Sequence, residues 1–143
     1  MNSFEIILTL IALVATATAL GVAWQKLNGR ARRTGAVSTV DLSQFPGAPA
    51  RGDAATLLQF STEMCSPCRS AHAVLSAIAA EQPGIAHIDV DLTHRADLAN
   101  KFNILQTPTT LVLDRDGTIR ARIGGAVKRA TVIAELDNFL APA

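Results

Sequence analysis

The chain is poor in cysteine: only two occur among its 143 residues, at positions 65 and 68. A small secreted scaffold built from disulfides carries several pairs, so that class of protein is excluded. A disulfide between residues three positions apart closes a loop too short to stabilise distant parts of a fold. The pair is therefore interpreted as reactive chemistry rather than as a structural cross-link.

Aromatic residues and excess positive charge are also scarce. Phe, Trp and Tyr make up 4 % of the chain, and the formal net charge is +1. From residue 36 onward, nine Lys and Arg residues stand against eleven Asp and Glu residues. Because no basic stripe with interleaved aromatics occurs, no nucleic-acid partner is expected. The sequence contains no internal repeats, and its length suits one domain of about 100 residues with an appendage.

The appendage is a long apolar run at the start of the chain, Phe4 to Trp24, whose only charge is Glu5. As a helix it would reach about 31 Å, which matches the hydrocarbon core of a bilayer. Residues 1–25 are therefore expected to form a transmembrane anchor that contacts lipid through residues 4–24. A cleaved signal peptide is the alternative, since small-residue sites occur at 15–17 and 17–19, although positive charge before the apolar run is scarce.

The charges after the run predict an orientation. Lys26, Arg30, Arg32 and Arg33 follow it with no acidic residue among them. By the positive-inside rule this flank lies on the cytoplasmic side, so the C-terminal domain is expected to be cytoplasmic, with an extracytoplasmic domain as the alternative.

Residues 26–52 are predicted to be a basic flank and linker with one short strand around 37–42, and residues 53–143 to be the folded domain. Periodicity and turn residues predict seven elements in the order β-α-β-α-β-β-α. They are strands at 56–60, 85–91, 109–113 and 119–123 and helices at 67–80, 96–102 and 127–140. This order predicts parallel strands with right-handed crossovers and an antiparallel edge hairpin.

The two cysteines form a CxxC motif with Ser66 and Pro67 between them. Cys65 is expected at the junction of a strand and a helix, where unpaired N–H groups and the helix dipole favour a thiolate. Cys68 would lie one turn further on, close enough to resolve a mixed disulfide formed by Cys65. Pro67 suits the first helical turn.

Other uses of the motif differ in what they require. Haem attachment needs a histidine where Arg69 stands. A zinc site would need His72, and His87 or His94, beside the cysteines, and a buried pair of thiols is a further alternative. No metal is expected. Arg69 and His72 are interpreted as an exposed and a partly buried helix residue, with a thiolate-tuning role open for Arg69.

Several separated segments resemble the thioredoxin family: 60–69 around the CxxC motif, Ile88–Asp91, Thr107–Thr109, and the glycines at 117 and 124. The resemblance implies an α/β three-layer fold with a mixed central sheet and helices on both faces. It implies that Cys65 is the nucleophile and Cys68 the resolver, and that no cofactor is needed beyond this redox pair. The implied partner is a protein disulfide.

The same resemblance implies further roles near the cysteines. Pro108 would be a cis-proline, Thr107 would present its backbone to the substrate, and Gly124 would leave room for the docking chain. Met64 would lie on the partner surface in place of the family's tryptophan. Gln59 stands where the family places a buried aspartate, and the family's first helix is shortened or lost before Asp53.

These features predict a membrane-tethered thiol–disulfide oxidoreductase that reduces protein disulfides and contributes to cell redox homeostasis. One alternative is an extracytoplasmic thioredoxin-like protein of cytochrome maturation or disulfide isomerisation. The other is a non-enzymatic metal-binding or interaction module.

Overall fold

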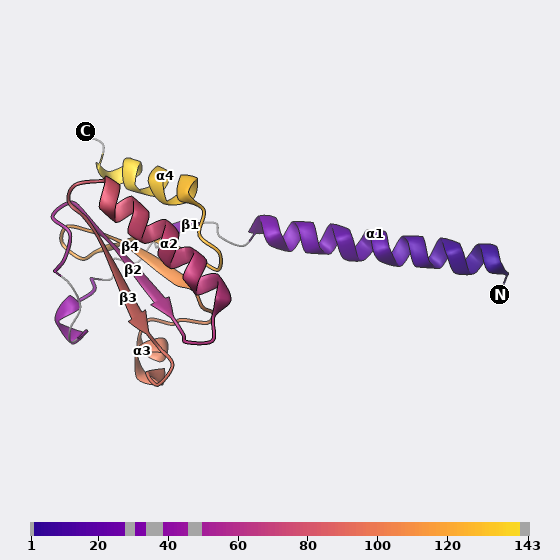
Figure 1. The fold of residues 1–143 in the computed structure, drawn as a ribbon, viewed down its shortest axis with the longest axis horizontal. Coiled ribbons are helices and arrows are strands. Elements are labelled where there is room, and N and C mark those ends of the chain that lie inside the picture. Colours follow the sequence, from indigo (N-terminus) through magenta and orange to yellow (C-terminus); the bar gives the residue numbers. More distant parts are fainter. Residues whose placement is uncertain (1, 28–30, 34–38, 46–49, 141–143) are drawn as a thin grey trace.

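The computed structural model describes residues 2–27, 31–33, 39–45 and 50–140, and it consists of a long N-terminal helix and an α/β domain (Figure 1). The helices are α1 (Ser3–Leu27), α2 (Ser66–Glu81), α3 (Ala96–Lys101) and α4 (Arg129–Leu140), with a short 3₁₀ helix at Leu42–Gln44. The strands are β1 (Ala31–Arg33), β2 (Ala55–Ser61), β3 (Ile85–Asp91), β4 (Thr109–Asp114) and β5 (Ile119–Gly124).

The strands form one sheet in the order β1-β5-β4-β2-β3. β2 and β3 are parallel, and the other neighbouring strands are antiparallel. Helices α2 and α4 cover one face and α3 lies toward the other (Figure 1). The predicted element order and the mixed three-layer architecture are confirmed.

The sheet is buried on both sides, which explains the almost continuous apolar run of β2. Leu57 packs in a core cluster with Leu75 of α2 and Leu136 of α4. The adjacent Leu58 and Phe60 belong to the second cluster, on the opposite face. Side chains alternate between the faces of a strand, so neighbouring apolar residues supply two separate cores.

The prediction for the sheet edge is wrong in two respects. β4 runs antiparallel to β2, so only β2-α2-β3 is a parallel crossover. The β4–β5 hairpin does turn at Asp116 and Gly117, and Gly117 has the φ of +83° that glycine tolerates best. That hairpin is not at the edge, however, because β1 pairs with β5.

Part of the stretch predicted as a linker belongs to the packed domain. Besides β1, Val40 and Phe45 are buried in the core cluster of Phe60. The strand expected around 37–42 is absent from its described part: Thr39 makes an isolated bridge to Thr118, and a 3₁₀ helix starts at Leu42. The chain turns there because the Asp41 carboxylate accepts a hydrogen bond from the Ser43 N–H at 2.9 Å. Positions 37 and 38 lie outside the described residues.

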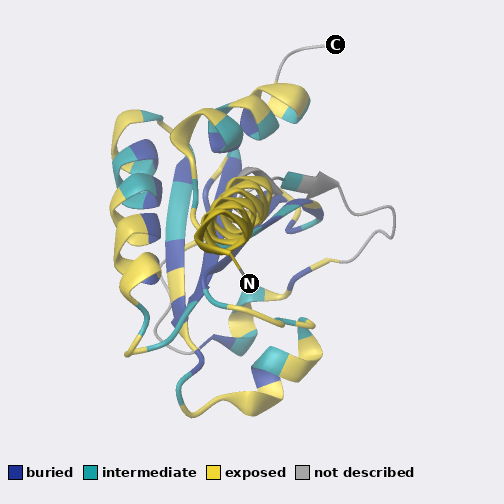
Figure 2. Ribbon diagram, turned by 90° about the vertical axis from the view of Figure 1, so that its right-hand side faces the viewer, coloured by how far each residue is buried: buried dark blue, intermediate teal, exposed yellow. Residues whose placement is uncertain are grey.

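Helix α1 contrasts with the domain in having no buried residue among those whose side chains are described (Figure 2). Ser3–Trp24 is long and apolar enough to cross a membrane, with a mean hydropathy of 2.4. A signal sequence near the N-terminus would meet the same criteria.

Candidate active site

Cys65 lies where the sequence predicts, directly before the first residue of α2. It is the N-cap of the helix, with extended backbone angles, and its carbonyl accepts from the Cys68 N–H at 3.1 Å. Pro67 occupies the first turn, where the N–H it lacks has no helical partner. The Cys65 sulfur is therefore carried by the residue nearest the unpaired N–H groups of the helix, a position that stabilises a thiolate.

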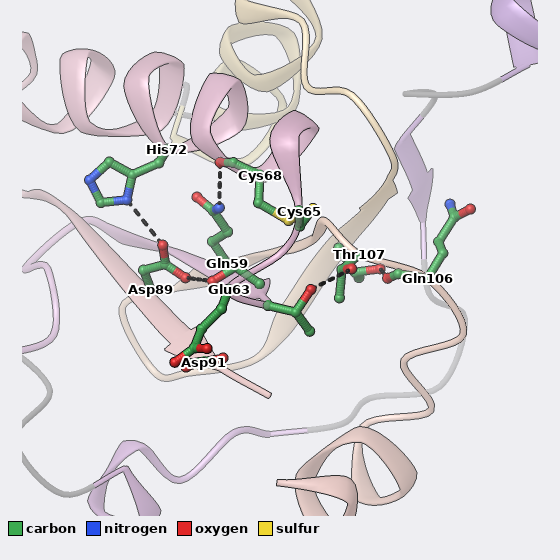
Figure 3. Close-up of a disulfide and its surroundings, with 12 residues drawn as sticks. Gln59, Glu63, Cys65, Cys68, His72, Asp89, Asp91, Gln106 and Thr107 are labelled. Atoms are coloured by element: carbon green, nitrogen blue, oxygen red, sulfur yellow. Dashed lines mark hydrogen bonds and ion pairs between the residues drawn. A yellow bond between two sulfur atoms is a disulfide. The ribbon is translucent and has the colours of Figure 1, made fainter. Parts of the chain in front are cut away.

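Cys65 and Cys68 are joined by a disulfide, with their Cα atoms 5.2 Å apart (Figure 3). Cys68 is buried, at 4 % exposure, whereas Cys65 is partly exposed. A partner can therefore reach Cys65 more easily than Cys68, which agrees with an attacking and a resolving cysteine. Ser66 and Pro67 between them are exposed.

The loop before β4 lies against the loop before Cys65. The Thr107–Pro108 peptide bond is cis, as the resemblance predicts. The Thr107 hydroxyl lies 3.4 Å from the hydroxyl of Thr62, and the Pro108 carbonyl accepts from the Gly125 N–H at 2.8 Å. Residues 107 and 108 are thus held beside the CxxC segment, and their contact with substrate stays a prediction.

The remaining predicted binding residues surround this site with different degrees of exposure. Met64 is 98 % exposed. A Cβ added to Gly124 would lie 2.4 Å from Nε2 of Gln106, so the space above this glycine is taken by an exposed, flexible side chain. A docking chain would have to displace Gln106, and the roles of Met64 and Gly124 stay predictions.

Behind the disulfide, Gln59 is fully buried and uses both ends of its amide. Its Nε2 donates to the Cys68 carbonyl at 3.0 Å (Figure 3). Its Oε1 accepts from Nε2 of His87 at 3.1 Å. The amide thereby connects the start of α2 to β3. It offers no titratable group next to Cys68.

His87 is half-buried beneath α2. Its pKa is lowered from 6.5 to about 4, mainly by burial and also by the neighbouring His72, while Asp89 opposes the shift. The rings of His72 and His87 meet edge to face, with centroids 4.8 Å apart. His87 is therefore neutral at pH 7.

His72 lies one helical turn beyond Cys68 and is hydrogen-bonded to Asp89. Its Nδ1 is 3.0 Å from the Asp89 carboxylate, whose other oxygen accepts from the Ser61 hydroxyl at 2.5 Å (Figure 3). A pocket of about 230 Å³ is lined both by this pair and by the two cysteines. Its lining residues are Ser61, Thr62, Glu63, Cys65, Cys68, Arg69, His72 and Asp89.

Sequence reasoning missed Asp89 and gave His87 only a place in a zinc site. Their spacing of two in a predicted strand was the available signal, because it puts both side chains on one face. Arg69 is exposed and lines the pocket. In the described part of the chain, no three His, Cys, Asp or Glu side chains are grouped as a metal site would require.

Comparison with known proteins gives a consistent family. The family model described as Thioredoxin matches residues 36–138. Thioredoxin of Mycolicibacterium smegmatis is 37 % identical over 87 residues, which are 59 % of this chain and 77 % of that protein. Thioredoxin of Chlamydia trachomatis is 33 % identical over 104 residues, covering 73 % of this chain and 92 % of that protein.

Among solved structures, thioredoxin f2 of Chlamydomonas reinhardtii superposes with a TM-score of 0.57 and 21 % identity. The match covers 76 % of this chain and all of that one, and it supports the fold alone. Together with the Cys65–Cys68 disulfide at the start of α2, the family match gives the activity. The chain belongs to the thioredoxin family and is a thiol–disulfide oxidoreductase.

Proposed function

We propose that this oxidoreductase is tethered to a membrane by α1 and reduces disulfides in other proteins at the cytoplasmic face. Thioredoxin-family proteins act on protein disulfides. The observation that carries the tether is an apolar helix with no buried residue in its candidate span, joined to a domain that has its own cores. In water such a surface would be unfavourable, whereas a bilayer would cover it.

The geometry of α1 supports a span. Its candidate span of 22 residues would reach about 33 Å, against about 30 Å for a hydrocarbon core. The hydroxyls of Thr16 and Thr18 donate to carbonyls one turn earlier, both at 2.7 Å. Polar groups satisfied within the helix are compatible with a lipid environment.

The direction of exchange is inferred from the residue types at the motif. In the reduced pair, the Cys65 thiolate attacks a substrate disulfide, forms a mixed disulfide and releases the first substrate thiolate. Cys68 then loses its proton and attacks the Cys65 sulfur, which forms the Cys65–Cys68 disulfide and releases the second thiolate. A proline directly before the second cysteine, Pro67 here, resembles the motif of the reducing members of the family. Lys26 and the arginines at 30, 32 and 33 favour a cytoplasmic domain, and thiols are kept reduced in the cytoplasm.

The test is a trapping experiment on the full chain in its native membrane. Cys68→Ser should accumulate mixed disulfides with membrane or membrane-proximal proteins through Cys65, because the resolving thiol is missing. Cys65→Ser and the double variant are the matched controls and should trap nothing. Recovery of the trapped adducts in the washed membrane fraction is the expected result.

Two outcomes would count against the proposal. If neither single variant traps a partner protein, the proposed exchange reaction is refuted. A mature chain whose mass shows cleavage after position 17 or 19 would show that α1 is a cleaved signal. Reporters active on only one side of the membrane, fused after Ala143, decide between a cytoplasmic and an extracytoplasmic domain.

A further inference from the structure

The resolving step of the proposed reaction needs a base that the buried interior does not supply. Cys68 must lose its thiol proton before it can attack the mixed disulfide at Cys65, because the thiolate is the nucleophile. The polar side chain behind it, Gln59, is an amide whose Nε2 already donates to the Cys68 carbonyl. The thiol proton of Cys68 must therefore leave on the side that faces away from Gln59.

On that side lies the pocket that Cys65 and Cys68 share with His72 and Asp89. A volume of about 230 Å³ holds several waters, since one water occupies about 30 Å³ in the liquid. His72 is half-exposed, with 53 % of its side chain accessible, so solvent reaches its ring. Waters in this pocket can connect the thiol with the imidazole.

The contacts of His72 orient it as a base. An ionised carboxylate only accepts hydrogen bonds, so Nδ1 of His72 carries the hydrogen that points to Asp89. The neutral ring then has its lone pair on Nε2, and this atom has no hydrogen-bond partner among the described residues. Nε2 lies on the side of the ring away from the disulfide (Figure 3), so a proton from Cys68 reaches it through more than one water. The Ser61 hydroxyl holds the second carboxylate oxygen of Asp89. A carboxylate that fixes the tautomer of a histidine is the arrangement that prepares general bases in hydrolases.

The other ionisable groups around His72 are less suited to act as the base. From β3, His87 packs against the ring, but its Nε2 donates to Gln59, it does not line the pocket, and its pKa of about 4 makes it a weak base. From α2, Arg69 remains protonated. Glu63 lines the pocket from the loop before Cys65 and is the one competitor that needs an experiment.

We propose that His72, oriented by Asp89, accepts the proton of Cys68 through waters of the pocket during resolution of the mixed disulfide; this inference rests on the proposed exchange reaction. The thiol S–H bond breaks, the proton passes through water to Nε2, and the thiolate attacks the Cys65 sulfur. The substrate thiolate leaves and is protonated by the imidazolium or by solvent. The substrate gains two electrons, and the cysteine pair loses two. Asp89 is a positioning residue in this step.

A two-phase measurement separates attack from resolution. The full chain, reduced and held in detergent micelles, is mixed with dithiobis-nitrobenzoate. Attack by Cys65 releases one coloured thiolate, and resolution by Cys68 releases the second. His72→Gln should leave the first phase unchanged and slow the second at pH 7 by at least about tenfold, since general bases contribute roughly 10²–10⁴-fold.

Further variants distinguish a base from a structural residue. The pH profile of the second phase should differ between the wild type and His72→Gln, because glutamine cannot accept a proton as a base. Added imidazole should accelerate His72→Ala, whereas sodium chloride at equal ionic strength should not. Asp89→Asn should slow the second phase less than His72→Gln does, and Glu63→Gln should leave it unchanged.

The outcomes separate this inference from the function on which it rests. A wild type without a first phase would refute the exchange reaction and the inference together. A normal first phase with an unchanged second phase in His72→Gln would refute the role of His72 alone. Slowing in Glu63→Gln instead would assign the proton to that carboxylate, and equal slowing of both phases in His72→Gln would show a structural effect.

Discussion

Acid is predicted to destabilise the folded domain through His87. The pKa of His87 is lowered from 6.5 to about 4, mainly by burial between β3 and α2 and also by His72, against an opposing effect of Asp89. As the pH falls through about 6.5, the unfolded chain binds a proton at this histidine and the folded chain does not. The stabilisation that neutral His87 contributes is therefore fully present above that pH, and it is lost as the pH falls toward about 4.

The magnitude follows from the size of the shift. At ~1.4 kcal/mol per pKa unit, the full shift would correspond to about 3 kcal/mol. His87 is only half-buried, and solvent screening reduces this figure to about 1–2 kcal/mol. The loss is large compared with the total stability of a small domain, about 5–15 kcal/mol.

The assay is urea unfolding of the full chain in mild detergent, measured between about pH 7 and pH 4 for the wild type and for His87→Gln. Glutamine stays neutral and can still donate to Gln59. The wild type should lose about 1–2 kcal/mol more than the variant across this range. His94→Gln, at an exposed histidine outside the network, is the control and should follow the wild type. A difference between wild type and His87→Gln that is independent of pH would refute the reasoning.

Three further predictions concern buried polar groups, and each is measured by urea unfolding, at neutral pH unless another pH is named. Burial opposes ionisation of Asp114, yet the Thr118 and Asp116 N–H groups and Arg120 hold its pKa below the usual value. Asp114→Asn should therefore lower the free energy of unfolding by about 1–2 kcal/mol, and this loss should become smaller as the pH falls below the usual range of a carboxyl. An equal loss in acid would contradict this. Thr110→Val should stabilise the protein by about 1 kcal/mol, because the buried Thr110 hydroxyl has no partner among the described residues, and a destabilised variant would show that the hydroxyl is satisfied. Gln59→Leu should lower the free energy of unfolding by about 2 kcal/mol, because it leaves the His87 N–H unpaired. The double variant with His87→Leu should recover part of that loss, whereas strictly additive losses would rule out the coupling.

Elements with local signals were predictable from the sequence. Helix α2 follows from apolar residues at helical spacing, a proline in its first turn and Pro83–Gly84 after its end. The β4–β5 hairpin follows from Asp116 and Gly117. β1 was not predictable, because three residues with two arginines carry no strand pattern and gain their structure only by pairing with β5.

The site divides in the same way. The sequence alone determined the CxxC pair and its place at the start of a helix, since both depend on neighbours along the chain; resemblance pointed to the cis Thr107–Pro108 bond. Only the tertiary structure placed Asp89 beside the cysteines: the parallel register pairs Gln59 with Asp89, and packing of α2 on β3 brings His72 to that carboxylate. Strand register and helix packing are settled by the burial of both faces of the sheet at once, a requirement that no single segment of the chain expresses.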